Sequence, residues 1–169
     1  QIERNHIVRI HGRAKFLSPT ELEVTKVRGE PELYSADSFV VASGSIPRKP
    51  DNIPVDHENV FDSDSILTML YLPRSLTVLG GGVIASEYAS IFQALGVKVT
   101  MIDRYPLPLG FMDADLTKKF VDSFQEMGGT WLGEKNVESV EWDSLSQVVT
   151  TCDDGTVVKS AKLLCAAGR

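Results

Sequence analysis

Residues 80–85 have the clearest chemical use, because they fit the pattern G-x-G-x-x-G/A of loops that bind a diphosphate. The first glycine permits a tight turn, the second lets a diphosphate approach the backbone, and the small last residue lets a helix lie against a strand. The helix that follows offers free N–H groups and its positive dipole end to the phosphates. A glycine-rich turn that binds nothing is the alternative. The loop consists of Gly80, Gly81, Gly82, Val83, Ile84 and Ala85.

Asp103 and Arg104 are the next candidates, because they stand about 20 residues beyond the first glycine, at the end of the following apolar stretch. At this spacing a carboxylate accepts hydrogen bonds from the adenosine ribose hydroxyls and repels a 2′-phosphate. Asp103 therefore favours NAD. A guanidinium at the same edge can bind a 2′-phosphate, so the Asp–Arg pair is also compatible with NADP. A solvated pair at the mouth of a loop is the alternative without a ligand.

These residues need a frame of strand, helix and strand, and the apolar pattern around them predicts one. Residues 76–79 are an apolar strand, and apolar side chains then recur at helical spacing over residues 84–95. Gly96 stands where a glycine commonly ends a helix, and residues 97–102 form a second apolar strand. The sequence therefore predicts a βαβ unit around the glycine loop.

The rest of the chain extends this unit into an α/β domain. A second helix is predicted over residues 116–127, closed by Gly128-Gly129, with a third strand at 130–132. Alternating strands and helices imply a parallel sheet with helices on both faces. Further strands are expected to form an antiparallel flap with a hairpin turn at 153–155, and a last strand is expected to return to the parallel sheet. They cover residues 137–142, 148–152, 156–158 and 163–166.

The residue pattern of the first third of the chain is different and predicts a β-meander. Strands are predicted within residues 7–16 and 21–27, and a short apolar strand at 38–42, with a turn signal at 18–20. Three prolines, Pro47, Pro50 and Pro54, then indicate a linker, because each fixes φ and removes a donor. A short helix is predicted from about residue 64 to 71, after N-cap residues.

Composition and charge exclude several classes of partner. Of 169 residues, 43% are hydrophobic, and the net charge is −6. This size and apolar content suffice for one or two compact domains. An acidic chain is a poor candidate for broad binding to nucleic acid or anionic membranes. No apolar run approaches the ~20 residues that span a bilayer. We therefore expect neither a nucleic-acid nor a membrane partner.

The cysteines and histidines form no motif. Cys152 and Cys165 make neither a C-x-x-C pair nor a disulfide framework, so we predict a reducing, cytoplasmic location and two buried strand residues. The histidines, His6, His11 and His57, have no acid or nucleophile at motif spacing, and we predict that they lie at the surface. No metal site is expected.

Three stretches together resemble the class I pyridine nucleotide-disulfide oxidoreductases, and this resemblance covers essentially the whole chain. Residues 40–47, VVASGSIP, are similar to the stretch that closes the first FAD-binding segment of that family. Residues 79–87, LGGGVIASE, resemble its NAD(P) loop with a glutamate in the following helix. Residues 166–169, AAGR, resemble the return of the chain to the FAD domain.

The resemblance implies how the chain is divided. Residues 1–50 are expected to belong to the first FAD-binding segment, as an incomplete β-meander, and residues 51–73 to be a linker with a short helix. Residues 74–169 are expected to form a Rossmann-like NAD(P)-binding domain. Because the last strand enters a turn that nothing follows, and the first residue is not Met, we expect a piece of a longer enzyme. Such a piece is expected to be inactive alone.

The same resemblance implies the cofactors NAD, NADP and FAD, with FAD only in the full-length protein, which is expected to be a homo-oligomer. Glu87 is expected to lie near the nicotinamide and the flavin as a catalytic residue. Val137 is expected to meet the adenine side through its backbone, and Gly168 to pass close to the dinucleotide. Val83 occupies the place of an aromatic gate in some relatives, so no such gate is expected here.

Ser43 and Gly44 belong to the first of the three stretches and are expected to contact cofactor as well. Two further stretches, residues 61–67 and 87–92, are most similar to the transhydrogenase branch of the family. That branch moves a hydride between NADPH and NAD⁺ through FAD and lacks the usual redox disulfide. A reductase of the dihydrolipoamide dehydrogenase type and a non-catalytic, dinucleotide-sensing module are the alternatives.

Overall fold

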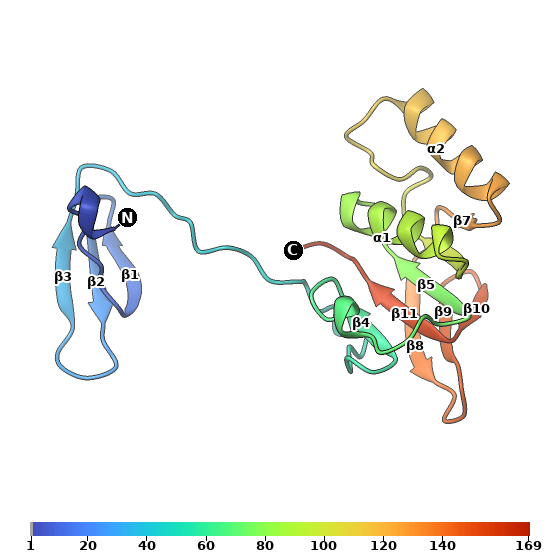
Figure 1. The fold of residues 1–169 in the computed structure, drawn as a ribbon, viewed down its shortest axis with the longest axis horizontal. Coiled ribbons are helices and arrows are strands. Elements are labelled where there is room, and N and C mark those ends of the chain that lie inside the picture. The colour runs from blue at the N-terminus through green and yellow to red at the C-terminus, as the bar shows by residue number, and fades with distance from the viewer. Residues whose placement is uncertain (1) are drawn as a thin grey trace. The chain divides into compact units, whose positions relative to one another are not determined.

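The computed structural model describes residues 2–169, and it divides them into two compact units. The first unit ends at Gly44 and the second runs from Ser45 to Arg169. Figure 1 shows the elements of each unit along the chain. The two units are described separately below.

The first unit is a three-stranded antiparallel meander, as the sequence predicts. Its strands are β1 (Arg13–Ser18), β2 (Glu21–Thr25) and β3 (Glu32–Ser35), preceded by a short 3₁₀ helix at Glu3–Asn5. The predicted strand at residues 38–42 is wrong, because the third strand lies earlier and pairs Leu22 with Tyr34. Val40 and Val41 are exposed and lie in no strand of this unit.

The second unit contains the predicted βαβ frame around a five-stranded parallel sheet of order β4-β11-β5-β6-β7. The chain runs from β5 through β6 to β7 and then crosses back to place β11 on the other side of β5. This reversal makes the gap between β5 and β11 a topological switch point, where α/β sheets bind ligands. The elements are β5 (Ser75–Leu79), α1 (Val83–Ala94), β6 (Lys98–Ile102), α2 (Ala114–Glu126), β7 (Thr130–Leu132) and β11 (Lys162–Cys165).

The region between the prolines and the βαβ frame holds a strand that the sequence did not reveal. β4 (Val60–Asp62) pairs in parallel with β11 at the edge of the sheet, so that Phe61 lies opposite Leu164. Three residues are too few for a recognisable alternation of apolar and polar side chains. The helix predicted over 64–71 is only a short 3₁₀ turn at Ile66–Thr68.

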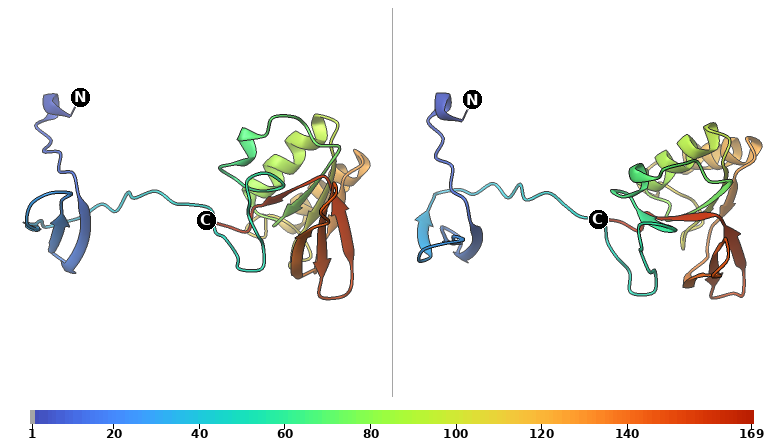
Figure 2. Two further views of the ribbon diagram at one scale, coloured as in Figure 1. Left: turned by 90° about the horizontal axis from the view of Figure 1, so that it is seen from below. Right: turned by 60° about the horizontal axis from the view of Figure 1, so that its bottom comes forward.

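Helices cover only one face of the parallel sheet, and here the expectation of helices on both faces is wrong. α1 and α2 lie on the same face, where the side-chain amide of Gln93 donates to the carbonyl of Phe124 (2.7 Å). The other face is covered by the antiparallel flap, as the views in Figure 2 show. Its strands are β8 (Val137–Trp142), β9 (Val148–Cys152) and β10 (Val157–Ser160).

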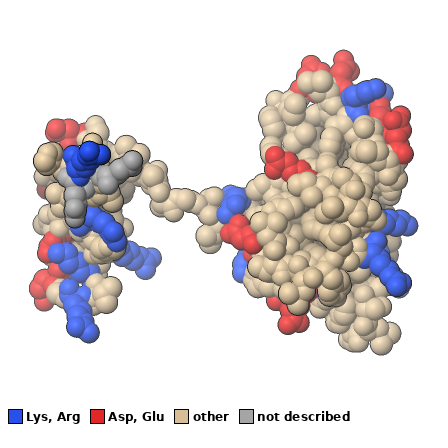
Figure 3. Space-filling model, viewed as in Figure 1, with Lys and Arg blue, Asp and Glu red and all other residues tan. Residues whose placement is uncertain are grey.

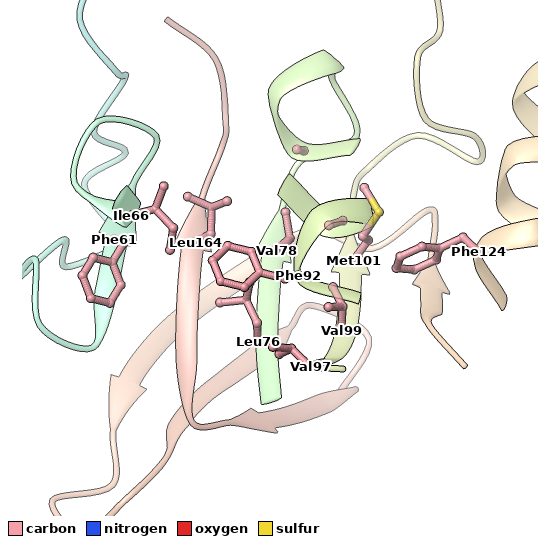
Figure 4. Packing of buried hydrophobic residues seen from close by; sticks show 12 residues of the cluster. Phe61, Ile66, Leu76, Val78, Phe92, Val97, Val99, Met101, Phe124 and Leu164 are labelled. Carbon is pink, nitrogen blue, oxygen red and sulfur yellow. The ribbon is translucent and has the colours of Figure 1, made fainter. Parts of the chain in front are cut away.

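Two apolar clusters hold these three layers together. On the helix face, Phe92 of α1 and Phe124 of α2 pack with strand residues such as Val78 and Met101 (Figure 4). On the flap face, Val148 and Cys152 pack with strand residues such as Leu163. Cys152 and Cys165 are both buried strand residues, as predicted, and burial raises the pKa of both thiols.

A buried chain of hydroxyls also links the sheet to the flap, and it should contribute to stability. Thr77 donates to the hydroxyl of Ser160 (2.8 Å), which donates to the carbonyl of Lys162 (2.8 Å). Thr77→Val keeps the side-chain volume and removes the first bond, so we expect the free energy of unfolding to fall by about 1 kcal/mol. Urea denaturation followed by circular dichroism measures this.

Thr150→Val is the matched control for that variant. The Thr150 side chain is as deeply buried, but its hydroxyl has no hydrogen-bond partner among residues 2–169. The same substitution there should leave the free energy of unfolding unchanged or raise it. If both variants lowered the free energy of unfolding equally, the hydroxyl chain would have no role in stability.

Candidate dinucleotide site

A cavity of about 540 Å³ lies where three strands of the parallel sheet end. Its walls come from the residues that follow β5, β6 and β11, together with the start of α1 and the segment that leads into β8. Because parallel strands end at one edge of the sheet, the glycine loop, Asp103 and Gly168 meet here although they are far apart in sequence.

The three glycines meet three different environments. Gly80 has a φ of +114°, its N–H donates to the carbonyl of Ile102 (2.8 Å), and a Cβ there would lie 2.5 Å from the Ala166 oxygen. Gly81 is buried, and its carbonyl accepts from the N–H of Leu109 (2.6 Å). Gly82 lines the cavity, and a Cβ there would meet no atom within 4 Å. The backbone is therefore open to a ligand at Gly82.

The start of α1 faces this open space without a side-chain cap. Gly82 is the N-cap residue, no side chain bonds to the first N–H groups, and the first turn holds no acid. These N–H groups and the positive end of the helix dipole are therefore free to bind an anion. Val83 and Ile84 line the cavity, whereas Ala85 is fully buried under the loop and lets α1 approach the sheet. The donor set thus fits a diphosphate.

Asp103 and Arg104 lie on the same wall, directly after β6. One Asp103 carboxylate oxygen accepts from the N–H of Tyr105 (2.8 Å), which fixes the side chain. The Arg104 guanidinium lies 4.8 Å from the centre of the Tyr105 ring and donates to its hydroxyl (3.0 Å). Both side chains therefore stay within reach of a ribose or phosphate in the cavity.

Val137 and Gly168 also line the cavity, and each is fixed through its backbone carbonyl. The Val137 carbonyl accepts from the side chain of Asn52 (2.9 Å), and the Gly168 carbonyl accepts from the N–H of Arg48 (2.9 Å). Arg48, Pro50, Asn52 and Ile53 form this wall of the site.

Glu87 does not line this cavity. It is exposed on the second turn of α1 and borders a separate hollow of about 350 Å³ with Leu67, Tyr88 and Ile91. Ile84 and Arg169 line both hollows. A ligand that extends from one hollow to the other past the start of α1 would bring its far end to Glu87.

Ser43 and Gly44 lie at the end of the first unit, and both are exposed. Their expected role in cofactor binding stays a prediction.

Six polar residues that line the cavity were not predicted as site residues from the sequence. They are Arg48, Asn52, Tyr105, Lys135, Asn136 and Arg169. Arg169 donates to Asp64 (3.0 Å) and to the carbonyl of Ser45 (3.1 Å), so this contact depends on segments distant in sequence. For Lys135 and Asn136, their position just after the third strand was the available signal, since strand ends carry ligand contacts in such sheets.

Other features of the described residues add no further site. Among residues 2–169, no group of three or more His, Cys, Asp or Glu side chains is placed to hold a metal ion. No helix in that range has the length and apolar character needed to cross a membrane. His6, His11 and His57 are exposed, as predicted, and His57 lies 4.0 Å from the carboxylate of Asp62.

The switch-point cavity, the glycine loop and the free helix start define an α/β domain of the Rossmann type. Comparison with known proteins makes the assignment narrower. The chain belongs to the pyridine nucleotide-disulphide oxidoreductase family, whose sequence profile matches residues 1–169.

Curated relatives and solved structures agree with this family. The soluble pyridine nucleotide transhydrogenase of Aliivibrio fischeri is 36% identical over 167 residues, which are 99% of this chain and 35% of that protein. The protein of the same name from Vibrio atlanticus is 36% identical, with 99% of this chain and 36% of the relative covered. The chain thus spans about a third of the length of these relatives.

Among solved structures, LpdA of Mycobacterium tuberculosis has a TM-score of 0.78 at 27% identity, covering 92% of this chain and 35% of LpdA. The HOCl-induced flavoprotein disulfide reductase RclA of Escherichia coli has a TM-score of 0.75 at 26% identity, covering 96% of this chain and 36% of RclA. The predicted fold class and family are confirmed. The predicted cofactors, pyridine nucleotides and a flavin, are those of the family.

Proposed function

We propose that this chain is the NAD(P)-binding part of an FAD-dependent oxidoreductase that moves a hydride between NADPH and NAD⁺. The main support for this proposal is the open space at Gly82. No side chain covers the backbone there, so a diphosphate in the cavity could approach it closely. The names of the relatives that are 36% identical support the transhydrogenase assignment. Cytoplasmic location and homo-oligomeric assembly of the full-length protein remain predictions.

In this proposal the chain binds and orients, and the two cofactors supply the hydride chemistry when bound. The N–H groups at the start of α1 hold the diphosphate, and Asp103 accepts from the adenosine ribose hydroxyls. Val137 and Gly168 border the dinucleotide through their backbones. Glu87, in the neighbouring hollow, contacts the nicotinamide end of a ligand that passes Ile84.

A flavin-dependent disulfide reductase is the second candidate, favoured by the similarity of the fold to the flavoprotein disulfide reductase RclA. Its chemistry needs a pair of redox-active thiols. Cys152 and Cys165 cannot serve, because both are buried in strands and burial raises the pKa of each thiol. In the full-length protein, reduction of an oxidised dithiol substrate by NADH would favour the reductase, and reduction of thio-NAD⁺ by NADPH would favour the transhydrogenase.

Calorimetric titration of the folded chain with NADH and with NADPH tests whether it binds dinucleotides at all. The proposal expects saturable binding of at least one of them. A folded sample that takes up neither ligand would contradict it.

Asp103→Asn tests how the ribose is recognised. Asparagine can still accept from the N–H of Tyr105, so the turn after β6 should survive. The loss of a charged acceptor for the ribose hydroxyls should weaken NADH binding about tenfold. NADPH binding should not weaken, since a carboxylate repels its 2′-phosphate. Titration of both ligands measures the difference, and equal weakening of both would assign Asp103 to structure alone.

A further inference from the structure

An ion pair and a hydrogen bond join the rim of the cavity beside Asp103 to the turn between β9 and β10. The backbone N–H of Lys135 donates to the Asp103 carbonyl (3.0 Å), which places Lys135 next to the acid at the ribose end of the site. Its side-chain ammonium forms an ion pair with Asp154, and the neighbouring Asn136 donates to Asp153 (2.9 Å). The ion pair lowers the pKa of Asp154 to about 2 and raises that of Lys135, so both are charged at neutral pH.

The cavity holds more positive than negative side chains, in a chain whose net charge is −6. Its cations are Arg48, Arg104, Lys135 and Arg169, and Asp103 is its acid. On the face of the second unit seen in Figure 3, charges of both signs occur in small groups. This local excess of positive charge suits a ligand with more than the two charges of a diphosphate.

The contact between Lys135 and Asp154 is easily exchanged. Both side chains are partly exposed, at 27% and 42%, and ion pairs at that exposure contribute little to stability. A phosphate monoester carries about −1.5 to −2 charges at neutral pH, against −1 for a carboxylate. A phosphate in reach of the ammonium therefore competes well with Asp154.

We propose, on the basis of the proposed function, that Lys135 binds the 2′-phosphate of NADP(H) and that Asp154 competes for the same ammonium. Asp154 then acts as a positioning residue that holds Lys135 aside when NAD(H) is bound and releases it to the phosphate. The pair sets the preference between the two dinucleotides: Lys135 favours NADP(H), opposite in effect to Asp103, whereas Asp154 favours NAD(H). The residues that distinguish NAD(H) from NADP(H) would then lie both at the end of β6 and in the segment after β7.

Three variants of the folded chain test this by calorimetric titration with NADPH and with NADH. Lys135→Met keeps the length of the aliphatic stem and should weaken NADPH binding about tenfold, with less than a twofold change for NADH. Asp154→Asn still accepts from the N–H of Thr156, so the turn survives, and it should strengthen NADPH binding about two- to fivefold. NADH binding should change less.

Asp153→Asn is the matched control, because it removes the same charge one residue away and leaves the Lys135 ion pair in place. It should change the NADPH-to-NADH affinity ratio by less than Asp154→Asn does. The inference would be overturned if Lys135→Met left NADPH binding unchanged, or if the two Asp variants had equal NADPH-to-NADH affinity ratios. In either case, NADH binding to the unmodified chain would still support the proposed function. Binding of neither dinucleotide to the unmodified chain would overturn both.

Discussion

Gly80→Ala is expected to lower the free energy of unfolding by roughly 3 kcal/mol or more and to abolish dinucleotide binding. Two effects add at this position. The φ of +114° is unfavourable for any residue with a Cβ, and a Cβ would lie 2.5 Å from the Ala166 carbonyl oxygen. That oxygen belongs to backbone that hydrogen-bonds to Leu79, so it cannot move aside without separating β11 from β5.

Gly96→Ala separates the two effects. Gly96 follows α1 with a φ of +84°, but a Cβ there would meet no atom within 4 Å. Alanine at this position would introduce only the backbone strain, about 1–2 kcal/mol. Gly96 also lies away from the cavity. Urea denaturation of both variants gives the difference. Equal losses from the two would show that the close approach of β11 to Gly80 does not matter.

The contrast between these glycines shows what the sequence could predict. Gly96 was recognisable as a helix end, because the apolar spacing over residues 84–95 stops just before it. A tight turn at Gly80 was also expected from the loop pattern. The last strand was expected to return to the parallel sheet, but its position beside β5 was not predicted, because this pairing joins residues more than 80 positions apart. Local patterns contain no information about such pairings.

The same limit applies to the site. The glycine loop and Asp103 could be found because they follow strands at a fixed spacing within one βαβ unit. Arg48 and Arg169 reach the cavity through contacts with distant segments, and no spacing indicates them. Glu87 was expected from family resemblance alone, and the structure places it in a neighbouring hollow. The flap was predicted as strands, but its position against the sheet depends on packing of side chains such as Val148.

Gly82→Asp is expected to affect stability and binding in opposite directions. Gly82 has a φ of −78° and open space around its Cβ position, so any residue is tolerated there. Aspartate is a better N-cap than glycine and favours the positive end of the helix dipole, so the free energy of unfolding should stay equal or rise by a few tenths of a kcal/mol.

The same carboxylate would occupy the space that the diphosphate needs and repel its charge. Two like charges about 4 Å apart near a protein surface cost about 4 kcal/mol, so NADH and NADPH binding should weaken by at least about a hundredfold. Gly82→Ser is the control, since serine is an equally good cap without the charge, and it should weaken binding less. If Gly82→Asp binds both dinucleotides as tightly as the unmodified chain, the diphosphate does not lie at the start of α1. The proposed site would then be wrong, although the fold would stand.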